Sequence, residues 1–150
     1  MNFARFVLAM AFVASAGLAV AEDPSSGKQV EGEWKLISIE KSGRQLPEES
    51  VKALPGTIMI GGGKIRGIVG DKTVYESDFI VNAAASPKTY EMRGGKDRKG
   101  KEVIVRGIFE IDADGHLRKC FTTGATAKPP KSFNTKETPG AQLNVYERVK

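Results

Sequence analysis

From residue 57 onward, apolar and polar side chains alternate along short segments that glycine-rich turns separate. In segment 73–81, Tyr75 and Phe79 fall on one face of an extended chain, and Glu76 and Asp78 fall on the other. A period of two residues is typical of strands that bury one face. Signals of this kind predict eight strands, at 33–40, 57–60, 64–69, 73–81, 88–93, 103–111, 116–122 and 143–149. The fold class is therefore predicted to be all-β.

The connections between these segments indicate how the strands are joined. Most are short turns, such as Gly61-Gly62-Gly63, and short turns favour antiparallel neighbours. The spacing suits a barrel or a sandwich. Eight strands close into a barrel whose interior holds side chains or one small ligand, so we predict an eight-stranded antiparallel meander barrel. One short helix is expected at 46–54, between the first two strands, because Pro47 opens it and Pro55-Gly56 ends it. We expect no other helix in the mature domain.

The only tryptophan, Trp34, follows Gly32 at the start of the first predicted strand. A large indole at this position is typical of a plug at one end of a barrel, and its N–H needs a partner when it is buried. Arg148 on the last predicted strand has a planar cation that can cover the ring. We therefore predict that Gly32, Trp34 and Arg148 close the barrel, where the first and last strands meet.

Residues 1–21 have the pattern of a secretory signal peptide. Met1 to Arg5 is short and carries one positive charge, the apolar run 6–20 follows, and Ala19-Val20-Ala21 offers a cleavage site. A membrane anchor is the alternative, but about 15 apolar residues are fewer than the roughly 20 that span a bilayer. The sequence thus predicts an exported protein, periplasmic or extracellular, with a flexible leader at 22–30 and one barrel domain at 31–150.

Charge and cysteine content narrow the classes of partner. The chain has 23 basic residues, and without Arg5 the remaining 22 face 18 acidic ones, a net charge of +4. This excess is mild and spread along the chain, so nucleic-acid binding is not expected. Cys120 is the only cysteine, which excludes an intramolecular disulfide, and the fold must rest on its core. We expect a monomer with no stable membrane insertion after signal cleavage.

The residues that usually carry catalysis or bind metals do not form a convincing set. Asp112 and Asp114 resemble the start of a calcium loop, but the distal glutamate is absent, so a hairpin turn is favoured. His116 is the only histidine, and on an extended strand it would lie about 13 Å from Cys120, too far for a nucleophile pair. Neither an enzyme, nor a metal site, nor a cofactor is predicted.

A basic segment interrupts the β pattern between the strands at 88–93 and 103–111. Residues 96–101 hold four basic side chains between glycines. Such a loop can contact phosphate, lipid headgroups or acidic polysaccharide. No aromatic residues are interleaved with the charges, so a solvated hairpin loop is the favoured interpretation.

Several short stretches, by their order and spacing over about residues 30–149, resemble an uncharacterised bacterial domain family that is abundant in planctomycetes and has lipocalin-like (calycin) architecture. The stretches are Gly32-Glu33-Trp34-Lys35, Arg44-Gln45-Leu46-Pro47, Pro87-Lys88, Gly107-Ile108-Phe109-Glu110-Ile111, Leu117 with Cys120-Phe121, Pro130-x-x-Phe133 and Tyr146-Glu147-Arg148. The resemblance implies a small exported β-barrel and no established activity.

The chain departs from this family at two positions. Pro129 stands where the family usually has arginine before the Pro-x-x-Phe motif. Lys119 stands where the family tends to be apolar, between Leu117 and Phe121. If these two neighbours point inward, the period of two points Lys119 inward as well, unless a twist or bulge frees it. A buried lysine needs a partner or loses its proton.

These observations lead to two hypotheses about function. The first is a non-catalytic, lipocalin-like module that holds a small apolar or amphipathic ligand in the barrel, with Lys119, Tyr75 and Phe109 as the candidate ligand-binding residues. The second is a barrel filled by its own side chains, whose loops dock a protein or a cell-envelope polymer. An interior cavity of a few hundred Å³ would favour the first.

Overall fold

The computed structural model describes residues 25–54 and 56–150. The predicted signal peptide and the start of the predicted leader, residues 1–24, lie outside the described residues. The described strands are β1 (Gly32–Lys41), β2 (Arg44–Gln45), β3 (Thr57–Gly61), β4 (Lys64–Val69), β5 (Lys72–Asn82), β6 (Thr89–Lys96), β7 (Glu102–Ile111), β8 (Leu117–Thr123) and β9 (Gln142–Arg148).

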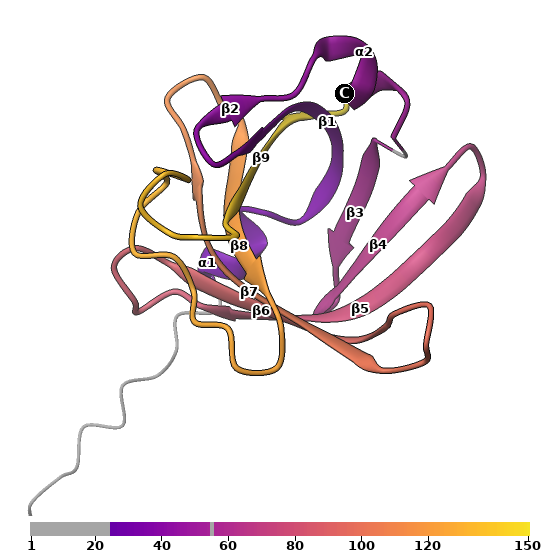
Figure 1. Ribbon diagram of the computed structural model, residues 1–150. Helices are drawn as coiled ribbons and strands as arrows, with labels where there is room; N and C mark the ends of the chain where they lie inside the picture. The colour runs from indigo at the N-terminus through magenta and orange to yellow at the C-terminus, as the bar shows by residue number, and fades with distance from the viewer. Residues whose placement is uncertain (1–24, 55) are drawn as a thin grey trace, which may run out of the picture.

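Eight of these strands form a closed antiparallel barrel (Figure 1). β1 pairs with β3, each strand from β3 to β8 pairs with the next one along the chain, and β9 pairs with β1. The two-residue β2 only extends the pairing at the end of β1. The predicted eight-stranded meander barrel is therefore confirmed, and its first and last strands meet.

Two short helices accompany the barrel. α2 (Glu48–Lys52) lies between β1 and β3, as predicted, and buries Val51. α1 (Ser25–Lys28) is a single turn that the sequence did not predict, since residues 22–30 read as a flexible leader. That prediction is wrong for the end of this segment, because the side chain of Val30 is only 1% exposed and fills space beside Trp34. Among the described residues, no helix is long and apolar enough to cross a membrane.

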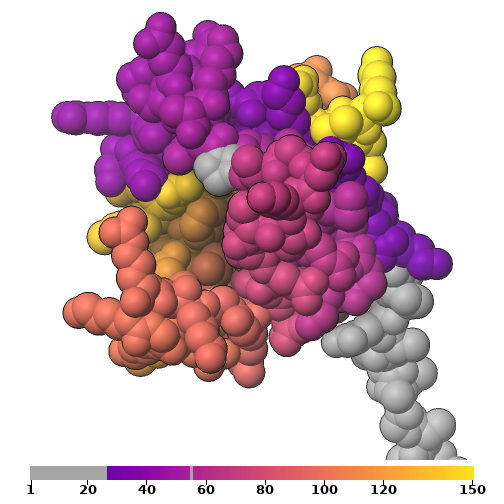
Figure 2. All heavy atoms as spheres, turned by 90° about the vertical axis from the view of Figure 1, so that its right-hand side faces the viewer, coloured from indigo at the N-terminus to yellow at the C-terminus, as the bar shows by residue number. Residues whose placement is uncertain are grey.

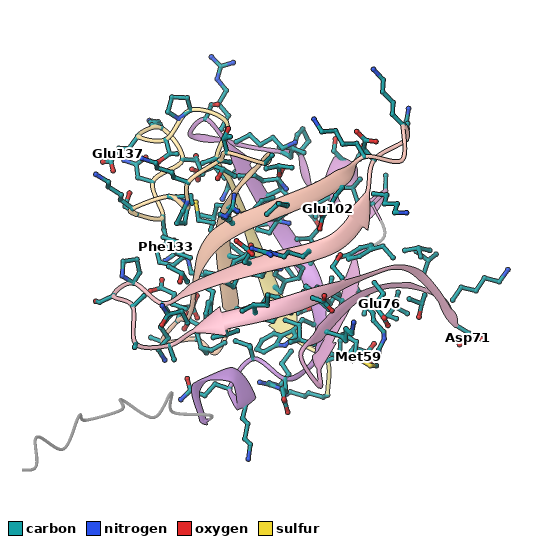
Figure 3. The ribbon with its side chains drawn as sticks, turned by 90° about the horizontal axis from the view of Figure 1, so that it is seen from below. Met59, Asp71, Glu76, Glu102, Phe133 and Glu137 are labelled. Carbon is teal, nitrogen blue, oxygen red and sulfur yellow. The ribbon has the colours of Figure 1, made fainter. Side chains whose placement is uncertain are left out.

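Apolar side chains are buried on both sides of part of the barrel wall. The larger cluster fills the interior and includes Trp34, Ile58, Ile60, Ile65, Phe79, Tyr90, Phe109, Leu117 and Tyr146. The smaller cluster lies outside the wall, where Ile108, Cys120 and Leu143 pack against Phe133 and Ala141. Phe133 belongs to the long loop between β8 and β9, which Figure 3 shows at one side of the barrel with Phe133 and Glu137 labelled. This loop therefore covers the outer face of β8.

The two ends of the barrel differ. At the end where β1 begins, Trp34 is fully buried. The opposite end carries α2 and the β4–β5 and β6–β7 hairpins, and Figure 3 shows Asp71 and Glu102 there. Figure 2 looks into this end and shows a hollow between these elements, with gold atoms of the C-terminal part of the chain at its floor. We call this end the mouth.

Candidate functional site

Lys119 lies on β8 and points into the barrel. Its side chain is 3% exposed, and its direct neighbours across the sheet are Phe109 on β7 and Asn144 on β9. Because Leu117 and Phe121 share its face of the strand, the period of two keeps all three inside. Lys119 is the one charged side chain among the buried groups of the described residues.

Three aromatic rings surround the Lys119 ammonium. Nζ lies 5.6 Å from the ring centre of Phe79 on β5, 4.9 Å from that of Tyr90 on β6, and 5.7 Å from that of Tyr146 on β9. All three distances are within the range of cation–π attraction. In the described part of the chain, no carboxylate lies within 4.0 Å of Nζ, and no acceptor is in hydrogen-bond geometry with it.

Burial dominates the ionisation of this group. It lowers the pKa of Lys119 from 10.5 to about 7, because the low-dielectric interior disfavours the charged form. Burial also raises the pKa of both Tyr90 and Tyr146, so these phenols are neutral near neutral pH. A cation in this cage therefore faces only neutral groups, and about half of the lysine side chains carry a charge at pH 7.

Polar side chains continue from the cage along β9 toward the mouth. Asn144 donates a hydrogen bond of 3.0 Å to the hydroxyl of Tyr146, and Gln142 donates one of 2.6 Å to Asn144. The hydroxyl of Tyr90, in contrast, is buried and has no hydrogen-bond partner among the described residues. Buried polar atoms without a partner are rare in folded proteins, and one beside an unpaired amine indicates a place for a further group.

The structure brings together two of the three residues that the sequence proposed for a ligand. Phe109 is the cross-strand neighbour of Lys119, and its ring meets that of Tyr90 at 6.3 Å and an interplanar angle of 65°. Tyr75 lies nearer the mouth, is 42% exposed, and covers Gly67, where a Cβ atom would be 2.1 Å from its ring. Phe109 is thus part of the floor and Tyr75 part of the entrance.

Sequence reasoning missed most of the cage. Phe79, Tyr90, Tyr146 and Asn144 all occupy inward positions of their strands, and this parity is the signal that could have suggested them. Their meeting at Lys119 depends on the register between strands, which a single sequence does not give.

Trp34 and Arg148 meet at the closed end. The guanidinium lies 4.2 Å from the Trp34 ring centre and donates hydrogen bonds to the carbonyls of Glu31 and Gln29, at 2.8 and 2.9 Å. The indole N–H donates to the carbonyl of Val30 at 2.8 Å. Gly32 has φ +125°, and a Cβ there would come within 2.6 Å of the Arg148 guanidinium. Every polar group of this arrangement that we have named has a partner.

In the described part of the chain, three of the cavities at the surface are not lined by Lys119. One of about 310 Å³ lies at the closed end beside Pro87 and Lys88, and one of about 220 Å³ lies outside β5, β6 and β7 next to Arg106. The third, of about 230 Å³, lies under α2 beside Val51. They have no charged group buried within them.

The turn between β7 and β8 holds the described residues best placed for a metal ion, Asp112, Asp114 and His116. The Asp112 carboxylate already accepts the backbone N–H groups of Asp114 and His116, at 3.0 and 2.9 Å. The hydrogen bond from His116 is the main reason why the pKa of Asp112 is lowered. The carboxylate thus shapes the turn, as the sequence suggested.

The basic loop lies at the mouth. β6 continues to Lys96, so the loop is a tighter turn than the sequence suggested, and Asp97 accepts the backbone N–H groups of Lys99 and Lys101 at 2.8 and 2.9 Å. The side chains of residues 96–101 are exposed. Four basic side chains against one carboxylate give the entrance a positive rim on this side.

Comparisons with models of protein families, with curated proteins and with solved structures found no match for this chain. The geometry of the barrel is therefore what supports a function.

Proposed function

We propose that the protein is an exported, lipocalin-like binding module, without catalytic activity, that holds one small amphipathic molecule in the mouth half of its barrel. The observation that carries this proposal is Lys119: a buried amine in an aromatic cage, with no acidic partner among the described residues. The hollow at the mouth lies on the side from which a ligand would enter the barrel (Figure 2).

A purely structural role explains Lys119 poorly. Burying an amine costs free energy unless hydrogen bonds or an opposite charge offset it, whereas leucine or methionine would fill the same space without that cost. The unpartnered hydroxyl of Tyr90 adds a second group of this kind. A ligand with a polar end would satisfy both groups.

The wall above the cage suits the apolar part of such a ligand. Leu36, Met92, Val105 and Phe121 are inward-facing, only partly buried, and packed on the interior cluster. On β6, β7 and β8, Met92, Val105 and Phe121 lie closer to the mouth than Tyr90, Phe109 and Lys119 do. Ligand sites commonly combine an apolar lining with a few polar groups that fix orientation.

The alternative is a barrel filled by its own side chains, which works through its loops. It is favoured by the lower half of the interior, where Trp34, Phe109 and Leu117 are almost fully buried, and by the position of the three surface cavities described above, which lie outside the barrel. On this view the exposed basic loop at residues 96–101 would be the docking surface.

Native mass spectrometry separates the two functions. The protein is expressed with its N-terminal segment, recovered from the cell envelope, and weighed before and after denaturing extraction. A discrete adduct that disappears on denaturation is expected, and it also gives the mass of the ligand. A bare protein mass, together with no response of the Tyr90 and Lys119 resonances to added amphiphiles, would support the filled barrel instead.

A further inference from the structure

The groups that face Lys119 restrict what can be bound there. They are the rings of Phe79, Tyr90 and Tyr146, with the Asn144 amide and Phe109 across the neighbouring strands. The nearest titratable groups on these elements are phenols with a raised pKa, and Tyr75 is the next one toward the mouth. Lys119 therefore supplies the only formal charge of the cage.

We infer that the ligand is a monocarboxylate, whose carboxylate lies between the Lys119 ammonium and the Tyr90 hydroxyl and whose apolar part extends toward the mouth. This inference rests on the proposed function and names its ligand class. A carboxylate has two oxygens that can accept from both donors at once, and hydrogen bonds between charged groups are the strong ones. The complex would leave neither group unpaired.

The balance of charge favours a carboxylate over a phosphate. One ammonium neutralises one negative charge, and the remaining polar neighbours, Asn144 and the phenols, are neutral. A phosphate monoester carries close to two negative charges near neutral pH, so one would stay buried without a cation, which is costly. A cationic headgroup would face Lys119 directly and be repelled.

The positions of the apolar side chains indicate which end of the bound acid faces the mouth. Thr123, at the mouth end of β8, lies four positions after Lys119, which corresponds to about 13 Å of strand. Phe121, Val105 and Met92 line this distance. This distance matches the length of a short to medium unbranched or ring-containing acid with its carboxylate at the bottom.

Binding of a carboxylate at Lys119 should depend on pH. A carboxylate binds the ammonium form, so the complex raises the pKa of Lys119 above its free value of about 7. Below pH 7 the free site is already charged, and the affinity is at its maximum as long as the acid stays ionised. Above pH 7 binding must take up a proton, so the affinity falls by up to about tenfold for each pH unit.

Four probes with the same unbranched tail test this: decanoate, decan-1-ol, decyltrimethylammonium and decyl phosphate. Calorimetric titration of the unmodified protein between pH 6 and pH 9 gives the affinities, and the NMR signal of the Lys119 Cε group gives its pKa with and without decanoate. We expect decanoate to bind tightest, with the pH dependence above and a raised Lys119 pKa.

Three variants test whether Lys119 and Tyr90 contact the carboxylate. Lys119→Met should weaken the binding of decanoate at least tenfold and leave the binding of decan-1-ol unchanged or tighter. Tyr90→Phe should weaken the binding of decanoate by a smaller factor. Lys88→Met, near the closed end, is the matched control and should change nothing. Equal binding of decanoate and decan-1-ol by the parent, or tighter binding of decyl phosphate, would overturn the carboxylate but keep the proposed function. No binding of any probe, together with a bare native mass, would overturn both.

Discussion

Among the described residues, three cations lie on aromatic rings, and two of them, Arg148 and Lys119, have opposite surroundings. Arg148 covers Trp34 at the closed end at 4.2 Å, and its guanidinium donates to the carbonyls of Glu31 and Gln29. Lys119 lies among three rings in the interior, and no hydrogen bond or ion pair with another described residue holds its ammonium. The same attraction to aromatic faces thus appears once together with hydrogen bonds to the backbone and once without any hydrogen bond among the described residues.

The difference separates a structural cation from one that is available to a ligand. The Arg148 guanidinium, which lies over a fully buried indole and donates two hydrogen bonds, fixes β9 to the segment just before β1. An ammonium is a compact charge whose pKa shifts readily when it is buried, so it can respond to what enters the site. The pair of Trp34 and Arg148 can be substituted separately from Lys119.

Trp34→Ala should have the largest effect on stability. It removes the side chain that fills the closed end and leaves Arg148 without its ring, so unfolding in urea should show a loss of about 3–5 kcal/mol. Trp34→Phe is the control, since it keeps an aromatic plug and loses only the hydrogen bond to Val30. A loss below about 1 kcal/mol for the alanine variant, as at surface sites, would contradict the role of the plug.

Lys119→Met should raise the free energy of unfolding at pH 7, whereas Trp34→Ala should lower it. Between pH 7 and 10.5 the unfolded chain holds a proton on Lys119 that the folded chain has released, so the stability of the parent rises with pH in this window. Lys119→Met lacks this rise. The amount by which its free energy of unfolding exceeds that of the parent at pH 7 should therefore shrink by about 1 kcal/mol per pH unit toward pH 9.

Unfolding in urea at pH 7, 8 and 9 measures this, with Lys88→Met as the control that should follow the parent. The raised pKa of Tyr90 and Tyr146 affects the parent and both variants alike, and so cancels in the difference. A constant gap between Lys119→Met and the parent at all three pH values would show that Lys119 is not shifted by burial.

Arg148→Met should have a smaller effect than either. It removes two hydrogen bonds and uncovers the Trp34 ring. Because the guanidinium is at the surface, water can replace part of these interactions, so the free energy of unfolding should fall by about 1–2 kcal/mol. Arg148→Lys should recover less than half of the stability that Arg148→Met loses, because an ammonium does not present two parallel donors. Ligand binding at Lys119 should be unaffected, and a large change there would contradict the separation of the two ends.

The fold could be predicted from the sequence because its signals are local. The alternation in segments such as 73–81 and the glycine-rich turns specify strand after strand, and the number of strands then favours closure. The turn α1 and the burial of Val30 were missed because they depend on contact with Trp34, which belongs to another element. The outer cluster around Phe133 was missed for the same reason.

The candidate site was predictable only in part. Lys119 was found because its neighbours Leu117 and Phe121 fix its parity within one strand. The rings around it come from β5, β6 and β9, and their level relative to Lys119 depends on the register between strands, such as Tyr90 opposite Gly107 and Asn144 opposite Lys119. A single sequence does not give this register, so the cage required the structure.

The smallest expected effect concerns the way to Lys119 rather than the site itself. Exposed basic side chains at the mouth should attract an anionic ligand over a few ångströms of water, so Lys99→Glu with Lys101→Glu should slow the association of decanoate about threefold at low salt. Dissociation should not change, and at about 1 M salt, where screening is strong, the variant and the parent should associate at equal rates. Lys88→Glu near the closed end is the matched control. A change in the dissociation rate instead would mean that the loop touches the bound ligand, and the site would then extend from the cage to the rim of the barrel.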